Sequence, residues 1–118
     1  MRWVVDAMNV IGARPDGWWR DRDTAVRRLV SALRALDEDV TVVLDAGPAE
    51  LAGPDVVIAR RRGRNAADDE IARLVSEDAD PGSLRVVTSD AELAERARQH
   101  GADVIGASAF RQQLDRLR

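Results

Sequence analysis

Five short apolar runs alternate along the chain with longer stretches in which apolar residues recur every three or four positions. The runs cover residues 3–5, 40–44, 56–58, 84–87 and 104–105 and are rich in β-branched side chains. Runs that are apolar on both faces are typical of strands covered by helices on both sides of a parallel sheet. The pattern therefore predicts an α/β fold with right-handed crossovers and three layers.

Four helices are predicted between and after these strands, with polar residues on their outer faces. Asp21 or Asp23 can cap the first helix and Asn65 the second. Asp80, Pro81 and Gly82 break the second helix, and Gly101 is a C-cap for the third. The apolar positions of the four helices are Val26, Leu29, Val30, Leu33 and Leu36; Ala67, Ile71, Leu74 and Val75; Leu93, Ala94 and Ala97; and Phe110, Leu114 and Leu117.

Length and composition narrow the class of protein further. The 118 residues are expected to form one domain, 1–118, with a sizeable core. No stretch reaches the ~20 apolar residues of a membrane span, so no membrane partner is expected. Without cysteine or a signal-peptide pattern, a cytoplasmic location is the default. All 18 basic residues are arginine, which excludes a P-loop lysine, Schiff-base chemistry and a receiver domain that needs a lysine near the fifth strand.

Acidic residues follow three of the predicted strands. Asp6, Asp45 and Asp90 would all stand at the carboxyl ends of strands, which is the ligand-binding edge of open α/β sheets. Asp68 and Asp69 begin a helix that could reach the same cleft. Crowded carboxylates raise one another's pKa, and a hard divalent cation such as Mg²⁺ or Mn²⁺ relieves their repulsion. Such a site favours hydrolysis of a phosphodiester.

Helix capping is the alternative explanation for each acid taken singly. Asp6 could cap the next turn, Ser89 to Glu92 fits a capping box, and Asn65 followed by Asp68 fits a capped N-terminus. Three strand ends with an aspartate at the same edge are harder to explain by capping. The coincidence favours a site.

Four motifs occur in a recognisable order: Val4-Val5-Asp6-Ala7-Met8-Asn9-Val10-Ile11-Gly12, Val43-Leu44-Asp45, Ala67-Asp68-Asp69-Glu70-Ile71 and Val87-Thr88-Ser89-Asp90. On these motifs the chain resembles PIN-like ribonucleases of the NYN group, closest to the bacterial YacP-like branch, over residues 2–105. The resemblance implies a three-layer α/β/α PIN-like (Rossmann-like) domain with a central sheet of about five parallel strands in the order 3-2-1-4-5. It also implies an endoribonuclease that depends on Mg²⁺ or Mn²⁺.

The same resemblance assigns roles to individual residues. Asp6, Asp68 and Asp90 would form the catalytic metal centre, and Asn9 would position substrate or water. Asp69 matches a second acid of some relatives, and Asp45 is a further candidate ligand. Ala7-Met8 replaces the usual Gly-Tyr. Where relatives often have another acid one turn beyond Asp90 this chain has Ala94, with Glu92 and Glu95 nearby at a different helical phase.

Arginine and tryptophan residues are the candidates for RNA contact. Arg60, Arg61, Arg62 and Arg64 directly precede the helix with Asp68, and arginine forks suit phosphate oxygens. Arg14 is a further candidate, and Trp18 and Trp19 could stack on unpaired bases. The alternative for the arginines is a charged run that is only solvated. The alternative for the tryptophans is a lid over the core or a dimer contact.

The expected function is therefore hydrolysis of RNA phosphodiester bonds at an acidic, metal-binding cleft. An inactive or weak PIN-like module that binds RNA or acts as a scaffold is a second hypothesis, although the three acids argue against it. A structure-specific DNA nuclease is a third. A homodimer and an inhibitory protein partner stay open as further partners.

Overall fold

A computed structural model describes residues 2–60, 63 and 65–116, and it contains the predicted parallel sheet. The strands pair in the order β3-β2-β1-β4-β5, as expected, and every pair is parallel. The first strand thus lies at the centre, between β2 and β4. The strands are β1 (Arg2–Asp6), β2 (Asp39–Leu44), β3 (Val56–Ile58), β4 (Leu84–Val87) and β5 (Asp103–Ile105).

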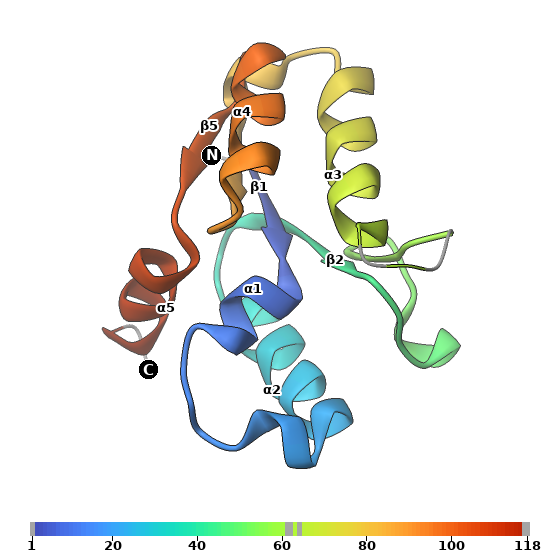
Figure 1. Cartoon of the computed structure of the whole chain (residues 1–118), viewed down its shortest axis with the longest axis vertical. Helices are drawn as coiled ribbons and strands as arrows, with labels where there is room; N and C mark the ends of the chain where they lie inside the picture. The colour runs from blue at the N-terminus through green and yellow to red at the C-terminus, as the bar shows by residue number, and fades with distance from the viewer. Residues whose placement is uncertain (1, 61–62, 64, 117–118) are drawn as a thin grey trace.

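Helices cover both faces of this sheet (Figure 1). Five α-helices are described: α1 (Ala7–Gly12), α2 (Arg22–Arg34), α3 (Ala66–Glu77), α4 (Ala91–Gln99) and α5 (Ala107–Arg116). Three single turns of 3₁₀-helix complete the described elements: η1 (Trp18–Arg20), η2 (Ala49–Leu51) and η3 (Pro81–Ser83). No described helix has the length and apolar character needed to cross a bilayer.

The alternation of side chains in β1 divides the core into two layers. Val5 points to the face covered by α1, α2 and α5, where it belongs to a cluster with Val10 and Phe110. Val4 points to the opposite face and belongs to a cluster with Ile71 of α3 and Leu93 of α4. Successive residues of a strand point to opposite faces of the sheet. A strand with consecutive apolar residues therefore packs against helices on both faces.

The short helix α1 was not predicted. The sequence indicated only a turn after Asp6, because six residues are too few to show a helical period. Packing stabilises this helix, since Val10 and Ile11 are buried against the core. A helix directly after β1 orients Asn9 back toward the end of the strand.

The predicted helix ends are partly correct. Asp21 caps α2 and accepts a hydrogen bond from the Thr24 N–H at 3.2 Å. Asn65 occupies the N-cap position of α3, but its side chain makes no capping hydrogen bond. Gly101 directly follows the C-cap His100 of α4 with φ +95°, a left-handed conformation that glycine adopts without strain. Leu117, expected in the last helix, lies outside the described residues.

Candidate active site

Asp6 is the central residue of the candidate site. It ends the central strand, and although it is ionisable it is only 2% exposed. The register places Val5 opposite Val87, so Asp6 lies beside Thr88, the next residue of the neighbouring chain segment. Asp6 Oδ2 accepts hydrogen bonds from Asn9 Nδ2 at 2.7 Å and from Thr88 Oγ1 at 3.3 Å. Both bonds hold the carboxylate in one orientation.

Asn9 links the two turns that border the site. Its side-chain nitrogen donates to Asp6, and its Oδ1 accepts a hydrogen bond from the Ser89 N–H at 3.0 Å. Thr88 adds a second link, because its Oγ1 donates to Asp6 and accepts from the Asp90 N–H at 3.1 Å. The end of β1 and the segment between β4 and α4 are therefore joined through side chains.

Asp90 caps α4. Its Oδ1 accepts a hydrogen bond from the Leu93 N–H at 2.9 Å. The alternative capping box that begins at Ser89 is wrong, because the N-cap is Asp90 and the Ser89 hydroxyl instead accepts from the Ala107 N–H at 3.0 Å. Capping does not remove the Asp90 carboxylate from the site, since its charge acts on both Asp6 and Asp68.

The pKa of Asp6 shows that Asp6, Asp68 and Asp90 form one electrostatic group. Burial and then the charge of Asp68 raise the pKa of Asp6 to about 6, with a smaller contribution from Asp90. The hydrogen bonds from Thr88 and Asn9 oppose this rise. The carboxylates of Asp6, Asp68 and Asp90, which come from β1, α3 and the start of α4, thus influence one another electrostatically at the carboxyl edge of the sheet.

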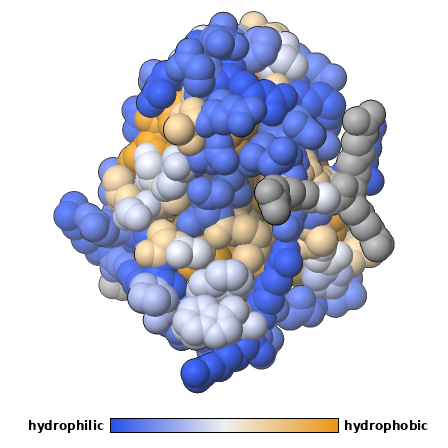
Figure 2. Space-filling view, viewed as in Figure 1, coloured by the Kyte–Doolittle hydropathy of each residue, from blue (hydrophilic) through white to orange (hydrophobic). Residues whose placement is uncertain are grey.

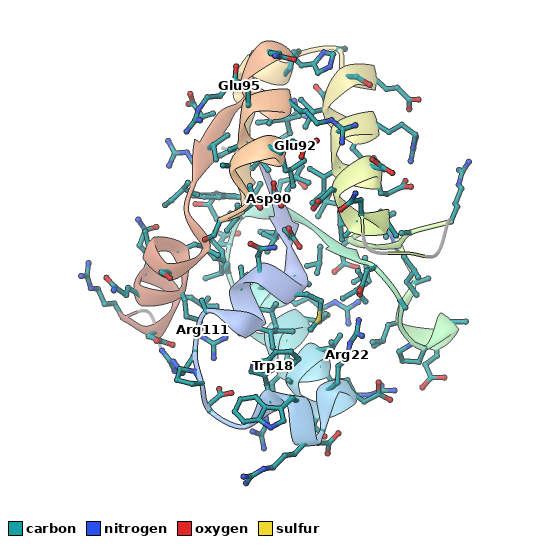
Figure 3. All side chains as sticks on the ribbon, viewed as in Figure 1. Trp18, Arg22, Asp90, Glu92, Glu95 and Arg111 are labelled. Atoms are coloured by element: carbon teal, nitrogen blue, oxygen red, sulfur yellow. The ribbon has the colours of Figure 1, made fainter. Side chains whose placement is uncertain are left out.

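Asp68 experiences the same repulsion from more neighbours. Burial raises its pKa most, followed by the charges of Asp90 and Asp69. Arg96 lowers the pKa of Asp68, and Glu92 raises it slightly. Figure 3 shows Asp90 at the start of α4 and Glu92 on the side of α4 that faces α3, with Glu95 farther along the helix. Glu92 is therefore the acid nearer to the group.

The two remaining acidic candidates have arginine partners. Asp69, whose side chain is 60% exposed, accepts a hydrogen bond from Arg96 Nη1 at 3.2 Å. Asp45 forms an ion pair with Arg22 of α2 and accepts from the Ala46 N–H at 2.8 Å. Both carboxylates are therefore neutralised locally, unlike that of Asp6.

The donor set of the acidic group fits a hard divalent cation in its chemistry and charge. Asp6, Asp68 and Asp90 offer carboxylate oxygens, which Mg²⁺ and Mn²⁺ prefer. Within the described part of the chain, however, no three His, Asp or Glu side chains are close enough together to hold a metal ion. Mg²⁺ commonly binds through one or two carboxylates and retains several waters. The group present here is compatible with that type of binding.

The structure describes one of the four arginines predicted to contact RNA. Arg60 borders a cavity of about 540 Å³ together with Asp69, Arg73 and Arg96. Arg61, Arg62 and Arg64 lie outside the described residues. Arg60 is thus on the same side of α3 as Asp69.

The remaining candidates for RNA contact lie on the loop before α2. Trp18 is half-buried against the core and meets the exposed Trp19 edge-to-face, with ring centroids 5.9 Å apart. Trp18 also lines a cavity of about 490 Å³ with Arg111 of α5. Arg14 forms an ion pair with Asp115. In Figure 3, Trp18 and Asp90 lie on opposite sides of α1, so Trp18 is not part of the acidic group.

Two residues that act on the acidic group, Thr88 and Arg96, were not predicted from the sequence. Thr88 received no role although it directly precedes Ser89-Asp90 at a strand end, a position that could have indicated a hydroxyl partner for Asp6. No sequence pattern indicated a role for Arg96, because its proximity to Asp68 and Asp69 depends on the packing of α4 beside α3.

The fold and the acidic edge together define an α/β protein of the PIN-like class. The model of the YacP-like NYN domain family matches residues 3–118, so the chain belongs to this family. The NYN family is nuclease-like, which supports a hydrolase of the ribonuclease type.

Solved structures are similar in fold. A crystal structure of Rae1 (YacP) from Bacillus subtilis has a TM-score of 0.74 and 22% identity, covering 99% of this chain and 75% of that one. The structure of a tryptophan-to-leucine mutant of the same protein has a TM-score of 0.77 and 21% identity, with 99% and 76% covered. A search of curated protein sequences found no match.

Proposed function

We propose that the chain is a metal-dependent endoribonuclease that hydrolyses phosphodiester bonds at the edge defined by Asp6, Asp68 and Asp90. The observation that carries the proposal is the burial of Asp6 beside two further acids. Burial most of all, and then the charges of Asp68 and Asp90, raise the pKa of Asp6 to about 6. A purely structural carboxylate at this position would gain stability from a nearby cation of the protein. The charges that act most strongly on Asp6 are instead negative.

Each residue of the group has a distinct role in the proposal. Asp6, Asp68 and Asp90 would hold Mg²⁺ or Mn²⁺, one or two of them directly and the rest through waters that the ion retains. Asp69 and Glu92 would adjust the charge around them. A bound cation supplies charge stabilisation at the phosphate and lowers the pKa of a coordinated water. Asn9 and Thr88 fix the orientation of the Asp6 carboxylate through their hydrogen bonds. Asn9 is accordingly a positioning residue.

The substrate in this proposal is RNA and the location is the cytoplasm. Arg60, together with Arg61, Arg62 and Arg64, would contact phosphates before the strand enters the acidic cleft. Trp18, Trp19 and Arg14 lie farther away and would act only on distant parts of a long substrate. Asp45 is the least favoured metal ligand, because Arg22 already pairs with it.

The test is cleavage of end-labelled single-stranded RNA, structured RNA and DNA of matched sequence by the purified protein. We expect internal cleavage of RNA with Mn²⁺ or Mg²⁺, none with EDTA, and recovery when metal is restored. Asp6→Asn should abolish cleavage. The exposed Asp103, at the opposite end of a strand, provides the matched control Asp103→Asn, which should cleave like the original chain.

The same experiment distinguishes the other hypotheses. Preferential cleavage of structured DNA would assign the site to a DNA nuclease. Binding of RNA without cleavage in either metal would indicate an RNA-binding module. Equal RNA cleavage by Asp6→Asn would contradict the proposed centre.

A further inference from the structure

A groove runs between α3 and α4, beside the acidic group. It consists of two adjoining cavities of about 540 and 310 Å³ that share Asp69, Arg73 and Arg96. Arg60 lines the first cavity, and Gln99 and His100 line the second. Figure 2 shows the surface over these two helices as largely hydrophilic. A polar groove of this kind suits a charged, extended ligand better than an apolar one.

Three arginines line the groove, although the whole chain has a formal net charge of −3. Arg73 pairs with Glu70 and Glu77, and Arg96 pairs with Asp69. A guanidinium has five N–H donors, so one that binds a carboxylate retains donors for a second oxygen ligand. Arg73 donates to Glu77 from Nη1 and to Glu70 from Nη2, and each of these two nitrogens has a second N–H. The carboxylates thus hold the guanidinium groups in place without using all their donors.

The groove begins at the acidic group. Arg96 is close enough to Asp68 to lower its pKa, and it binds the adjacent Asp69 directly. From Asp69 the groove follows α3 past Arg73 to Ser76, a distance of roughly 10 Å at 1.5 Å per residue. A strand with its reacting phosphate at Asp68 could therefore place a neighbouring phosphate beside Arg96 and a further one beside Arg73.

We propose that the groove between α3 and α4 binds the backbone of the RNA strand next to the bond that is cleaved, with Arg73 and Arg96 contacting phosphate oxygens. This inference rests on the proposed function and specifies how that site holds its substrate. Arginine contacts to phosphates position a strand without selecting its bases. The groove is therefore expected to contribute affinity and register, and no sequence preference.

The experiment measures binding of a fluorescent single-stranded RNA at several salt concentrations. All proteins carry Asp6→Asn, so that the RNA stays intact. Arg73→Gln with Arg96→Gln should weaken binding roughly tenfold and reduce the slope of log affinity against log salt by about 1.4, since each single-strand phosphate contact contributes about 0.7. The matched control is Arg27→Gln with Arg34→Gln, which likewise removes two ion-paired arginines, both on α2 and outside the groove. Its slope should equal that of the parent.

Thermal unfolding verifies that each variant is folded. Because Arg73 pairs with the buried Glu70, Arg96→Gln alone serves as a second variant, with an expected slope reduction of about 0.7. An unchanged slope in the folded Arg96→Gln variant, or an equal reduction in the control, would contradict the proposed binding of RNA in the groove. If the original chain cleaves RNA while the slopes are equal, only the groove is wrong. If it cleaves no RNA but the slopes differ as expected, only the proposed nuclease function is wrong.

Discussion

At the scale of single residues, Asp6 balances two opposing effects. Hydrogen bonds from the Thr88 hydroxyl and from the Asn9 backbone stabilise its ionised form, while burial and the charges of Asp68 and Asp90 disfavour that form. The second effect is larger, because the pKa rises from 3.8 to about 6. A charged Asp6 therefore lowers the stability of the metal-free fold, and a bound cation would reverse this loss.

The pH dependence of Asp6→Asn follows from that shift. Between pH 3.8 and about 6 the folded chain binds more protons at Asp6 than the unfolded chain, so the contribution of Asp6 to stability is greatest below pH 3.8 and falls as the pH rises to about 6. Without metal, Asp6→Asn should thus be more stable at pH 7 by up to about 3 kcal/mol, given 1.36 kcal/mol per pKa unit. The difference should vanish near pH 4, as measured by urea unfolding.

Metal supplies the control for this prediction. Mn²⁺ should raise the thermal midpoint of the original chain at pH 7 and leave that of Asp6→Asn nearly unchanged, because a ligand stabilises only the state that binds it. An Asp6→Asn variant less stable than the original chain at pH 7 would show that the Asp6 carboxylate is held by favourable contacts alone.

Asp68 and Asp69 are adjacent but unequal. Neighbouring helical residues point about 100° apart, and here only Asp68 is among the main charges that act on Asp6, whereas Asp69 pairs with Arg96. Asp68→Asn is expected to lose nearly all RNA cleavage. Asp69→Asn should retain a measurable fraction that increases with added Mn²⁺. Cleavage kinetics across a metal titration test this, and the reverse result would shift the assignment by one residue.

At the scale of elements, α4 depends on Asp90 in two ways. Its side chain caps the helix through the Leu93 N–H, and its charge belongs to the acidic group. The aspartate thus satisfies both of the interpretations that its position in the sequence allowed. One substitution can separate them, since asparagine is as good an N-cap as aspartate.

Asp90→Asn should keep the stability of the original chain and lose RNA cleavage by at least about tenfold, in the range found for disturbed metal sites. Asp90→Ala should lose cleavage and also about 1 kcal/mol of stability, because the cap is removed. Urea unfolding and cleavage rates of both variants provide the measurement. Full activity in Asp90→Asn would leave Asp90 with the capping role alone.

At the scale of the whole molecule, Arg2 joins the beginning of the chain to a loop 76 residues away. Its Nη1 and Nη2 donate to the two carboxylate oxygens of Asp78, both at 2.8 Å, and Nε donates to Ser83 at 3.0 Å. These bonds attach β1 to the segment between α3 and β4. The strand that ends in Asp6 is therefore held at both ends.

Asp78→Asn should lower the urea midpoint at pH 7. The bond to Arg2 lowers the pKa of Asp78 to about 2, so its stabilising contribution is present above pH 3.8 and is lost as the pH falls toward 2. The difference from the original chain should narrow over that range. Glu50→Gln, which breaks the exposed single-bond pair with Arg27, is the control and should have a smaller effect at pH 7.

The sequence by itself was sufficient for the parallel sheet, and the family resemblance added its strand order. Apolar runs such as 3–5 and 42–44 require burial on both faces. Because these runs alternate with helical periods, a parallel sheet covered by helices is the expected fold. Parallel strands share one carboxyl edge, so Asp6 at the end of β1 and Asp90 after β4 lie at the same edge when these strands are neighbours. The strand order observed here satisfies that condition.

Only the tertiary structure decided how these residues are used. Helix α1 forms because Val10 and Ile11 pack on the core. A segment of six residues is too short for its helical periodicity to be recognised in the sequence. Asp45 has an arginine partner because Arg22 of α2 reaches it, and Arg96 lies near Asp68 because α4 packs beside α3. Sequence patterns report which faces must be buried. The partner of a charged side chain depends on distances between segments far apart in the chain, which only the packed fold determines.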